Sequence, residues 1–214
     1  TNLSTALSAA NGGDELWVAA ATEDSGGTLI PFAGRYRPGT TADAEASFQL
    51  KPGVNLYGGF LGTETSIVER NLKWPAAEVS WLTGWGGVTR HILCADAGIT
   101  DETVVDGFRI VAAGTPGASG LDGVGAGLLN EGGSPVFRNC LFVSLQGQSG
   151  SAVYSTGGNP TFINCVFTQN SATTAAGGTV SATDGAPRLI NCTVTANTAP
   201  VGGVGGVVLP TDGE

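Results

Sequence analysis

Several residue types are scarce in this chain, and each scarcity narrows what it can do. Among 214 residues there is no methionine, one histidine, and only Lys51 and Lys73 as lysines. No apolar run reaches the ~20 residues that a membrane-spanning helix needs. Acidic residues outnumber basic ones by 18 to 9, and the formal charge of -9 argues against binding to nucleic acid or to an anionic membrane surface. We therefore expect no nucleic-acid partner and no membrane span in this segment.

The start of the chain and its overall composition give a second set of expectations. Because methionine is absent and no cationic, apolar signal segment precedes Thr1, the sequence predicts a mature product or an excised fragment. The 35 glycines indicate many turns, and 41% hydrophobic residues suffice for one continuous core. One domain over 1–214 is the expected organisation.

A repeat marks the second half of the chain. The pattern Pro-x-apolar-x-Asn-Cys-x-apolar begins at Pro135, Pro160 and Pro187, which gives repeat lengths of 25 and then 27. Glycine-led apolar blocks precede each copy, and a further block begins at Gly205. The apolar residues alternate with period two, which predicts short strands with one face toward a core. Repeats of this length, with two or three short strands and no helix, predict the coils of a parallel β-helix.

The repeated Asn-Cys pair has a structural interpretation in such a stack. Asparagine tolerates a left-handed bend better than other residues that carry a Cβ, and Gly107 occupies the equivalent position one unit earlier. Stacked coils would place the amides in a hydrogen-bonded ladder and the thiols in an interior column beside it. The expected members are Asn139, Asn164 and Asn191 for the ladder, and Cys140, Cys165 and Cys192 for the column.

Disulfide and metal interpretations of the thiols are less favoured. Parallel side chains at a strand spacing of ~4.8 Å keep their Cβ atoms slightly too far apart for good disulfide geometry. A zinc site needs clustered cysteine pairs with histidine, whereas the only histidine is His91 and the thiols are spaced linearly. We therefore expect reduced, buried thiols, no metal and no cofactor. His91 has no evident serine or cysteine partner and is expected to be a strand residue.

The first half of the chain is less regular. Residues 1–12 have apolar side chains at helical spacing and end at glycines, which predicts a short helix capping the open end of the stack. The glycine- and proline-rich segment 23–37 is expected to be an inserted surface loop. Because the block at Gly205 begins another coil, the natural polypeptide is expected to continue beyond Glu214. We expect irregular coils with long loops over 13–115, regular coils with the repeat length given above over 116–214, and early strands within 42–50, 54–60, 81–85 and 91–95.

These features together resemble a known group of proteins. The motifs Gly13-Asp-Glu-Leu-Trp-Val, Phe48-Gln-Leu-Lys-Pro-Gly-Val-Asn-Leu-Tyr-Gly-Gly-Phe and Val105-Asp-Gly-Phe-Arg-Ile are similar to those of bacterial surface proteins of the right-handed parallel β-helix type. The Asn-Cys-x-Phe repeats resemble those of polymorphic outer-membrane-protein passengers and related pectin-lyase-like folds. The resemblance covers nearly the whole chain and implies an all-β, single-stranded, right-handed parallel β-helix with a short N-terminal capping helix, secreted or displayed on a bacterial cell surface. It implies fold more strongly than activity, because this fold hosts lyases, hydrolases, adhesins and stalks alike.

Candidate catalytic groups are few. A lyase or hydrolase of this fold needs clustered carboxylates and a basic residue, but no charged residue recurs at the coil spacing in the regular half. Asp106 is explained structurally as the residue before a glycine bend, and Asp101 and Glu102 as part of a solvated turn. No catalytic residue is therefore assigned. Glu64, Glu69 and Arg70 are expected to form an exposed ion pair or a capping contact. The candidates that lie close in sequence are Asp96, Asp101, Glu102, Asp106 and Arg109.

Three tryptophans are the candidates for a ligand contact. Trp74, Trp81 and Trp85 are candidate glycan contacts because exposed indole rings stack on sugar faces. Packing beneath long loops is the favoured alternative. The outward row of Leu141, Val166 and Thr193 predicts an apolar strip, which a loop or a partner would cover.

The sequence therefore predicts, first, a non-enzymatic secreted or cell-surface β-helical module that acts as an adhesin, passenger or structural spacer. One alternative is a polysaccharide lyase or glycoside hydrolase of the pectin-lyase-like fold. Another is a carbohydrate-binding module that uses the tryptophans. The expected partner is a polysaccharide or a host or cell-surface ligand.

Overall fold

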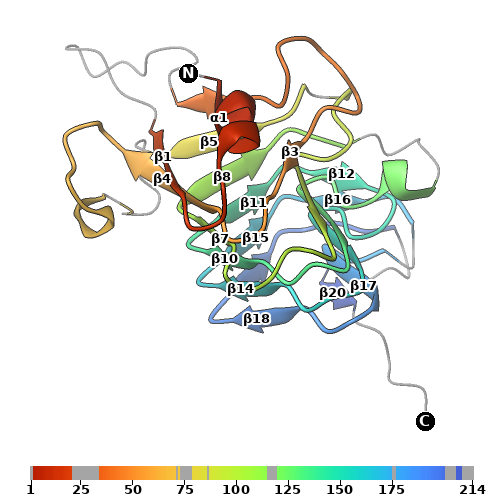
Figure 1. Cartoon of the computed structure of the whole chain (residues 1–214). Helices are drawn as coiled ribbons and strands as arrows, with labels where there is room; N and C mark the ends of the chain where they lie inside the picture. Colours follow the sequence, from red (N-terminus) through yellow and green to blue (C-terminus); the bar gives the residue numbers. More distant parts are fainter. Residues whose placement is uncertain are drawn as a thin grey trace.

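Parallel β-sheets make up most of the molecule (Figure 1). The computed structural model describes residues 2–20, 34–70, 72, 79–85, 87–114, 120–174, 177–200 and 206–208. Its strands form three six-stranded sheets and one two-stranded sheet, and the named strands pair in parallel throughout. The described helices are α1 at Leu3–Ala9 and two short 3-10 helices, η1 at Ile67–Glu69 and η2 at Gly120–Gly123. The chain is thus mostly β with one short α-helix, as the sequence predicts.

Each large sheet takes strands from the whole length of the chain, and we name the three sheets 1, 2 and 3. Sheet 1 contains β1 Glu15–Ala19, β4 Asn55–Phe60, β7 Val104–Asp106, β10 Val136–Arg138, β14 Thr161–Ile163 and β18 Arg188–Ile190. Sheet 2 contains β2 Arg35–Tyr36, β5 Ser80–Thr83, β8 Phe108–Val111, β11 Leu141–Val143, β15 Val166–Thr168 and β19 Thr193–Thr195. Sheet 3 contains β3 Phe48–Gln49, β6 Leu93–Asp96, β9 Leu128–Glu131, β13 Val153–Thr156, β17 Val180–Asp184 and β20 Val207–Val208. The small sheet pairs β12 Gln146–Gly147 with β16 Ser171–Ala172.

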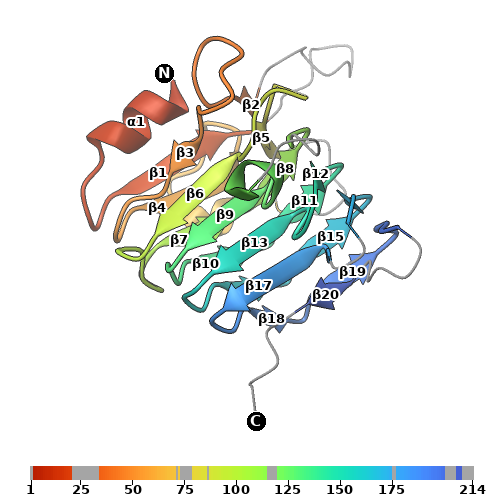
Figure 2. The ribbon, with the colours of Figure 1, turned by 90° about the vertical axis from the view of Figure 1, so that its right-hand side faces the viewer.

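The chain visits the three large sheets in rotation. After β7 in sheet 1 it forms β8 in sheet 2 and β9 in sheet 3, and it then returns to sheet 1 as β10, which pairs with β7. Figure 2 shows the strands of sheet 3 stacked in order from β3 to β20. Parallel neighbours need a crossover connection of a dozen or more residues, and here the strands of the other two sheets form that connection.

The spacing between paired residues separates a regular part of the molecule from an irregular part. In sheet 1, Val136 pairs with Thr161, and Thr161 with Arg188, which reproduces the repeat length seen in the sequence. Longer connections toward the N-terminus widen the separation between paired residues without changing the parallel pairing. These more widely separated pairs are Val104 with Val136, Leu56 with Val105 and Glu15 with Asn55.

Phenylalanines of successive coils form the centre of the core. Phe137 stacks on Phe162 with ring centroids 5.2 Å apart, and Phe142 on Phe167 with centroids 4.8 Å apart. The two members of each stack pair in register on adjacent strands, and all four side chains are 0% exposed. Complete burial of such a side chain contributes about 1.5–3 kcal/mol. The period-two alternation of the repeat therefore places its apolar residues where they stabilise the stack most.

α1 lies against the N-terminal end of the sheets (Figures 1 and 2). The side chain of Asn2 accepts a hydrogen bond from the Ser4 amide at 2.9 Å, and Leu3 and Leu7 are buried. The Lys51 ammonium donates to the carbonyl oxygens of Ser8 and Ala10, which ties the end of the helix to the loop after β3. With seven residues, α1 is too short to cross a bilayer, and no other helix in the described ranges is long and apolar enough to do so.

Several strand boundaries differ from the sequence prediction. β3 takes up only Phe48–Gln49 of the segment 42–50, and β6 begins at Leu93, so His91 lies before the strand and its assignment to a strand is wrong. β2 lies inside the segment 23–37, which was expected to be a loop, because the Trp81 amide donates to the Gly34 carbonyl at 2.7 Å and draws the end of that segment into sheet 2. Residues 23–33 of that segment lie outside the described residues.

Candidate functional site

An asparagine ladder runs along the corner where the chain passes from sheet 1 to sheet 2. Asn139, Asn164 and Asn191 have φ values of 50°, 54° and 53°, in the left-handed region that asparagine tolerates. The Asn191 amide donates to Asn164 Oδ1 at 2.7 Å, while Asn164 Nδ2 lies 3.5 Å from Asn139 Oδ1. All three side chains are exposed. The asparagines thus bend the chain between sheets and line its outer edge with amides.

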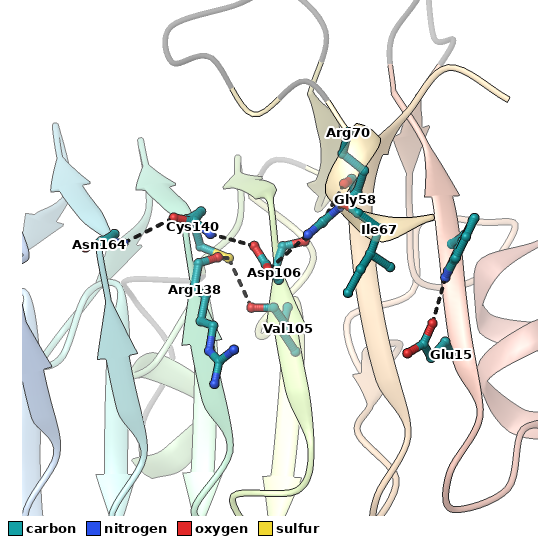
Figure 3. Close-up of polar contacts among 11 residues, drawn as sticks. Glu15, Gly58, Ile67, Arg70, Val105, Asp106, Arg138, Cys140 and Asn164 are labelled. Atoms are coloured by element: carbon teal, nitrogen blue, oxygen red, sulfur yellow. Dashed lines mark hydrogen bonds and ion pairs between the residues drawn. The ribbon is translucent and has the colours of Figure 1, made fainter. Parts of the chain in front are cut away.

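The ladder ends on a buried ion pair (Figure 3). Asn139 Nδ2 donates to Asp106 Oδ1 at 2.9 Å, and Arg70 Nη2 donates to Asp106 Oδ2 at 3.1 Å. The side chains of Arg70 and Asp106 are 5% and 9% exposed. Arg70 also donates to the carbonyl oxygens of Gly58 and Ile67, at 3.0 and 2.9 Å. Both oxygens of the Asp106 carboxylate are therefore engaged, as a buried charge requires.

The position of Arg70 corrects one prediction. Of the two expected arrangements, an exposed ion pair with Glu64 or Glu69 is wrong, because the Arg70 guanidinium lies over the rings of Tyr57 and Phe60, with Cζ 5.1 and 5.4 Å from their centroids. These rings and the buried Asp106 attract the side chain inward. Glu69 instead accepts from Thr65, and Glu64 accepts from the backbone amides of residues 61–63. The hydrogen bond from the Leu61 amide is the main reason that the pKa of Glu64 is lowered.

The thiols of the repeat point to the inside of the same corner. Cys140 and Cys165 are 2% and 0% exposed, Cys192 is half-buried, and all of the chain's cysteines are free. The hydrogen bond with the neighbouring thiol raises the pKa of Cys165, as it does that of Cys192, and burial adds to both shifts. A protonated, buried thiol is a poor nucleophile and a poor metal ligand. The geometry therefore gives the thiols a packing role.

The acidic candidates occupy different places in the fold. Asp96 ends β6 in sheet 3, where its Oδ1 accepts from the Gly98 amide at 2.9 Å. Asp101 and Glu102 are exposed in the turn before β7, and Asp106 ends β7 in sheet 1. Across the described ranges, no three His, Cys, Asp or Glu side chains form a group that could hold a metal ion.

His91 is a half-buried residue next to a backbone carbonyl. Its Nδ1 lies 3.2 Å from the carbonyl oxygen of Gly125. Burial lowers the pKa of His91 below its usual 6.5, although the Gly125 contact opposes the shift. A neutral ring held against the backbone is consistent with a structural role.

The tryptophans lie beside arginines. The Cζ atoms of Arg35 and Arg109 are 4.5 and 4.4 Å from the centroid of the Trp81 ring, and Arg37 Cζ lies 4.4 Å from that of Trp85. Guanidinium groups at these distances are attracted to the face of an indole ring. Trp74 lies outside the described residues. The sequence alone does not predict which arginine lies beside which tryptophan. The residues lie on β2, β5 and β8 and just after β2 and β5, which are far apart in the sequence.

The outward row of sheet 2 is covered to different extents along the stack. Leu141 is 4% exposed and packs with Val111 and Val143, whereas Val166 is half-buried and Thr193 is exposed. A cavity of about 150 Å³ adjoins this row and the asparagine ladder. It is lined by Leu72, Val79, Gly107, Phe108, Asn139, Cys140, Leu141, Asn164 and Val166.

A second asparagine column was missed in the sequence. Asn170 and Asn197 follow β15 and β19, six residues after the ladder asparagines of their coils. Asn170 Nδ2 donates to Asn197 Oδ1 at 3.0 Å. Their separation, which equals that of Asn164 and Asn191, was the available signal. The sequence also did not predict a left-handed backbone at the residue before this position in each coil, because no single residue type is common to these sites. The residues are Ala112, Ser144, Gln169 and Ala196.

Comparison with known proteins does not identify this chain. The chain matches no protein-family model, no curated protein and no solved structure. A functional assignment must therefore come from the residues themselves.

Proposed function

We propose that this chain is a right-handed parallel β-helix and serves as a non-enzymatic module of a secreted or cell-surface protein, acting as an adhesin, passenger or spacer. The rotation of the chain through three parallel sheets supports the β-helix. The nearly constant separation of paired residues in the second half of the chain supports it too. The handedness, the bacterial origin and the surface location rest on the resemblance of the repeats and motifs described above.

The observation that carries the non-enzymatic assignment is the engagement of Asp106. This carboxylate ends the asparagine ladder, and it is buried whereas the acidic candidates Asp96, Asp101 and Glu102 are exposed. Both of its oxygens instead accept structural hydrogen bonds, one from Asn139 and one from Arg70. A general base needs a free oxygen within reach of a substrate proton. Asp106 therefore supports the corner rather than chemistry.

The mechanism of such a module is mechanical. Each coil adds one strand to each sheet and buries its apolar side chains on those of the preceding coil, as the phenylalanine stacks do. The result is a rigid support from which the loops between strands project. A polysaccharide or another cell-surface ligand would be contacted by those loops and by the outer faces of the sheets.

A depolymerisation assay tests this proposal. The purified chain is incubated with acidic and neutral polysaccharides, with and without calcium, and new reducing ends and unsaturated products are measured. We expect no turnover with any of them. Turnover of any of these polysaccharides would refute the proposal and favour a lyase or hydrolase. Its loss in Asp106→Asn, in a variant that still unfolds cooperatively, would identify Asp106 as part of the active site.

One observation favours the carbohydrate-binding alternative. Trp85 and Tyr36 line a hollow of about 420 Å³ together with Asn2 and Thr40. Aromatic rings with small polar groups are the usual lining of sites that bind sugars. Binding without turnover would be compatible with both a surface module and a dedicated carbohydrate-binding module.

A further inference from the structure

A row of arginine and tryptophan on the outer face of sheet 2 takes no part in the ladder or the main core. Arg35 of β2 pairs in register with Trp81 of β5, and Trp81 pairs with Arg109 of β8. Because β2 and β8 flank β5 on opposite sides, the two guanidinium groups approach the indole from opposite sides. Their strands are two spacings apart, or roughly 9.6 Å. The sheet therefore holds two cationic groups at a defined separation.

Buried hydrogen-bond donors gather at this row and at the neighbouring Trp85. Arg109 Nε and the indole nitrogens of Trp81 and Trp85 have no hydrogen-bond partner among the described residues. A buried donor without an acceptor costs about 1–3 kcal/mol. Such groups in a folded protein call for an explanation, and a bound acceptor is one of them.

Within the described part of the chain, Arg109 takes part in no ion pair. Burial, followed by the proximity of Arg35, lowers the pKa of Arg109. A chain with a formal charge of -9 thus keeps two like charges beside one indole ring. An anion beside Arg109 would balance the charge of its guanidinium group.

The hollow lined by Trp85 continues this row toward α1. Arg35 and Arg37 both line it, and Arg37 lies over the Trp85 ring. Guanidinium groups bind sulfate and carboxylate oxygens with paired, directional hydrogen bonds. The aromatic and polar lining of the hollow suits a sugar ring better than an acidic peptide. The overall negative charge disfavours nucleic acid, which binds to extended basic surfaces.

We propose that Arg35, Arg37, Trp81, Trp85 and Arg109 form a binding site for an anionic polysaccharide. Sulfate or carboxylate groups of the ligand bind Arg109 and Arg35, and a neighbouring sugar ring occupies the hollow beside Trp85. Groups about two strand spacings apart, roughly 9.6 Å, fit the two arginines best. The site goes beyond the surface-module assignment and does not depend on it, since it uses neither Asp106 nor the asparagine ladder.

Affinity electrophoresis of the whole chain tests the site. Native gels contain dextran sulfate or, as the matched neutral polymer, dextran, at about 0.15 M salt, where non-specific charge effects are largely screened. We expect dextran sulfate to retard the parent protein and dextran not to. Arg109→Gln should weaken the binding about tenfold or more, equivalent to about 1.4 kcal/mol. Trp81→Phe keeps an aromatic ring at this position but removes the indole N–H, and should weaken binding by a smaller factor.

The matched control is Arg138→Gln, which removes the same charge from an exposed position on sheet 1. It should leave binding within about twofold of the parent, because its charge is screened from the site. Thermal unfolding of each variant checks that the fold is kept. An equal loss in Arg109→Gln and Arg138→Gln, or no retardation of the parent, would overturn the proposal.

Two further probes identify the ligand class. Polyglutamate that binds as tightly as dextran sulfate would overturn the polysaccharide assignment in favour of an acidic polypeptide. Millimolar sodium sulfate that displaces the polymer completely would show a site for a free oxyanion and overturn it equally. Weak competition by both supports the proposal. Enzymatic turnover, the result that refutes the non-enzymatic function, is measured separately and leaves these binding outcomes distinguishable.

Discussion

The molecule contains two columns of asparagine that have different structural roles. The ladder of Asn139, Asn164 and Asn191 is exposed, and its amides mainly contact one another and the Asp106 carboxylate. The column of Asn170 and Asn197, which we call the buried column, lies at the other end of the sheet 2 strands, where Asn170 is 0% exposed and Asn197 is half-buried. The asparagines of the first column have left-handed backbone themselves. In the second column it is the preceding residue, Gln169 or Ala196, that has left-handed backbone.

The buried column bonds to the backbone of the preceding coil. Asn170 Nδ2 donates to the Phe142 carbonyl at 3.0 Å, and Asn170 Oδ1 accepts from the Leu145 amide at 3.1 Å. Asn197 Nδ2 donates to the Phe167 carbonyl at 2.9 Å in the same way. Buried backbone groups need hydrogen-bond partners. At this turn the asparagine side chains supply the partners that a neighbouring strand supplies elsewhere in the sheet. The exposed column therefore serves the conformation of the bend, whereas the buried column provides hydrogen-bond partners for backbone groups.

The largest effect on stability is expected at the buried Asp106, which bonds to Asn139 at one end of the exposed column. Asp106→Ala leaves the Arg70 guanidinium buried without its carboxylate, and removing one partner of a buried pair typically costs about 3–5 kcal/mol. We expect a decrease of this size in the free energy of unfolding, measured by urea denaturation. The control is the double variant Arg70→Met with Asp106→Ala, which should recover most of the loss. A decrease below about 1 kcal/mol in the single variant would contradict the buried-pair account.

The second prediction compares the two columns directly. Asn170→Ala removes the acceptor of the Leu145 amide and a donor to the Phe142 carbonyl, so we expect a loss of about 2–4 kcal/mol. Amide hydrogen exchange should also become faster at Leu145, which a general loss of packing would not single out. The matched variant is Asn164→Ala in the exposed column, with a smaller loss and no change at Leu145. Equal effects at both positions would remove the distinction between the columns.

The exposed column could be predicted from the sequence because its signal is local and repeated. Each asparagine stands next to a cysteine and between apolar residues with period two, and the three copies keep a nearly constant spacing. That pattern predicts strands, register and bend together. The parallel pairing of Phe137 with Phe162 and of Phe162 with Leu189 follows directly from it.

The buried column and the ion pair could not be found in the same way, for physical reasons. Asn170 and Asn197 are only two copies of the pattern. In the preceding coil the equivalent position, six residues after Asn139, is Leu145, and its backbone amide donates to Asn170. Arg70 and Asp106 belong to coils of unequal length, so no period in the sequence relates them. The row of Arg35, Trp81 and Arg109 has the same origin, since long connections separate three strands that meet only in the folded sheet.

The smallest expected effect isolates the backbone at the exposed bend. Asn164→Gly and Asn164→Ala both remove the amide contacts, but only alanine places a Cβ at a φ of 54°. A left-handed conformation costs a residue with a Cβ roughly 1–2 kcal/mol, while glycine adopts it freely and loses about 0.4–1 kcal/mol through its more flexible unfolded chain. We therefore expect the glycine variant to be the more stable of the two by up to about 1 kcal/mol in urea denaturation. Thr193, exposed in the extended strand β19, gives the control, because there alanine should be more stable than glycine. If alanine were preferred at both positions, the left-handed bend would not be the reason for the asparagine, and the ladder contacts would have to explain it.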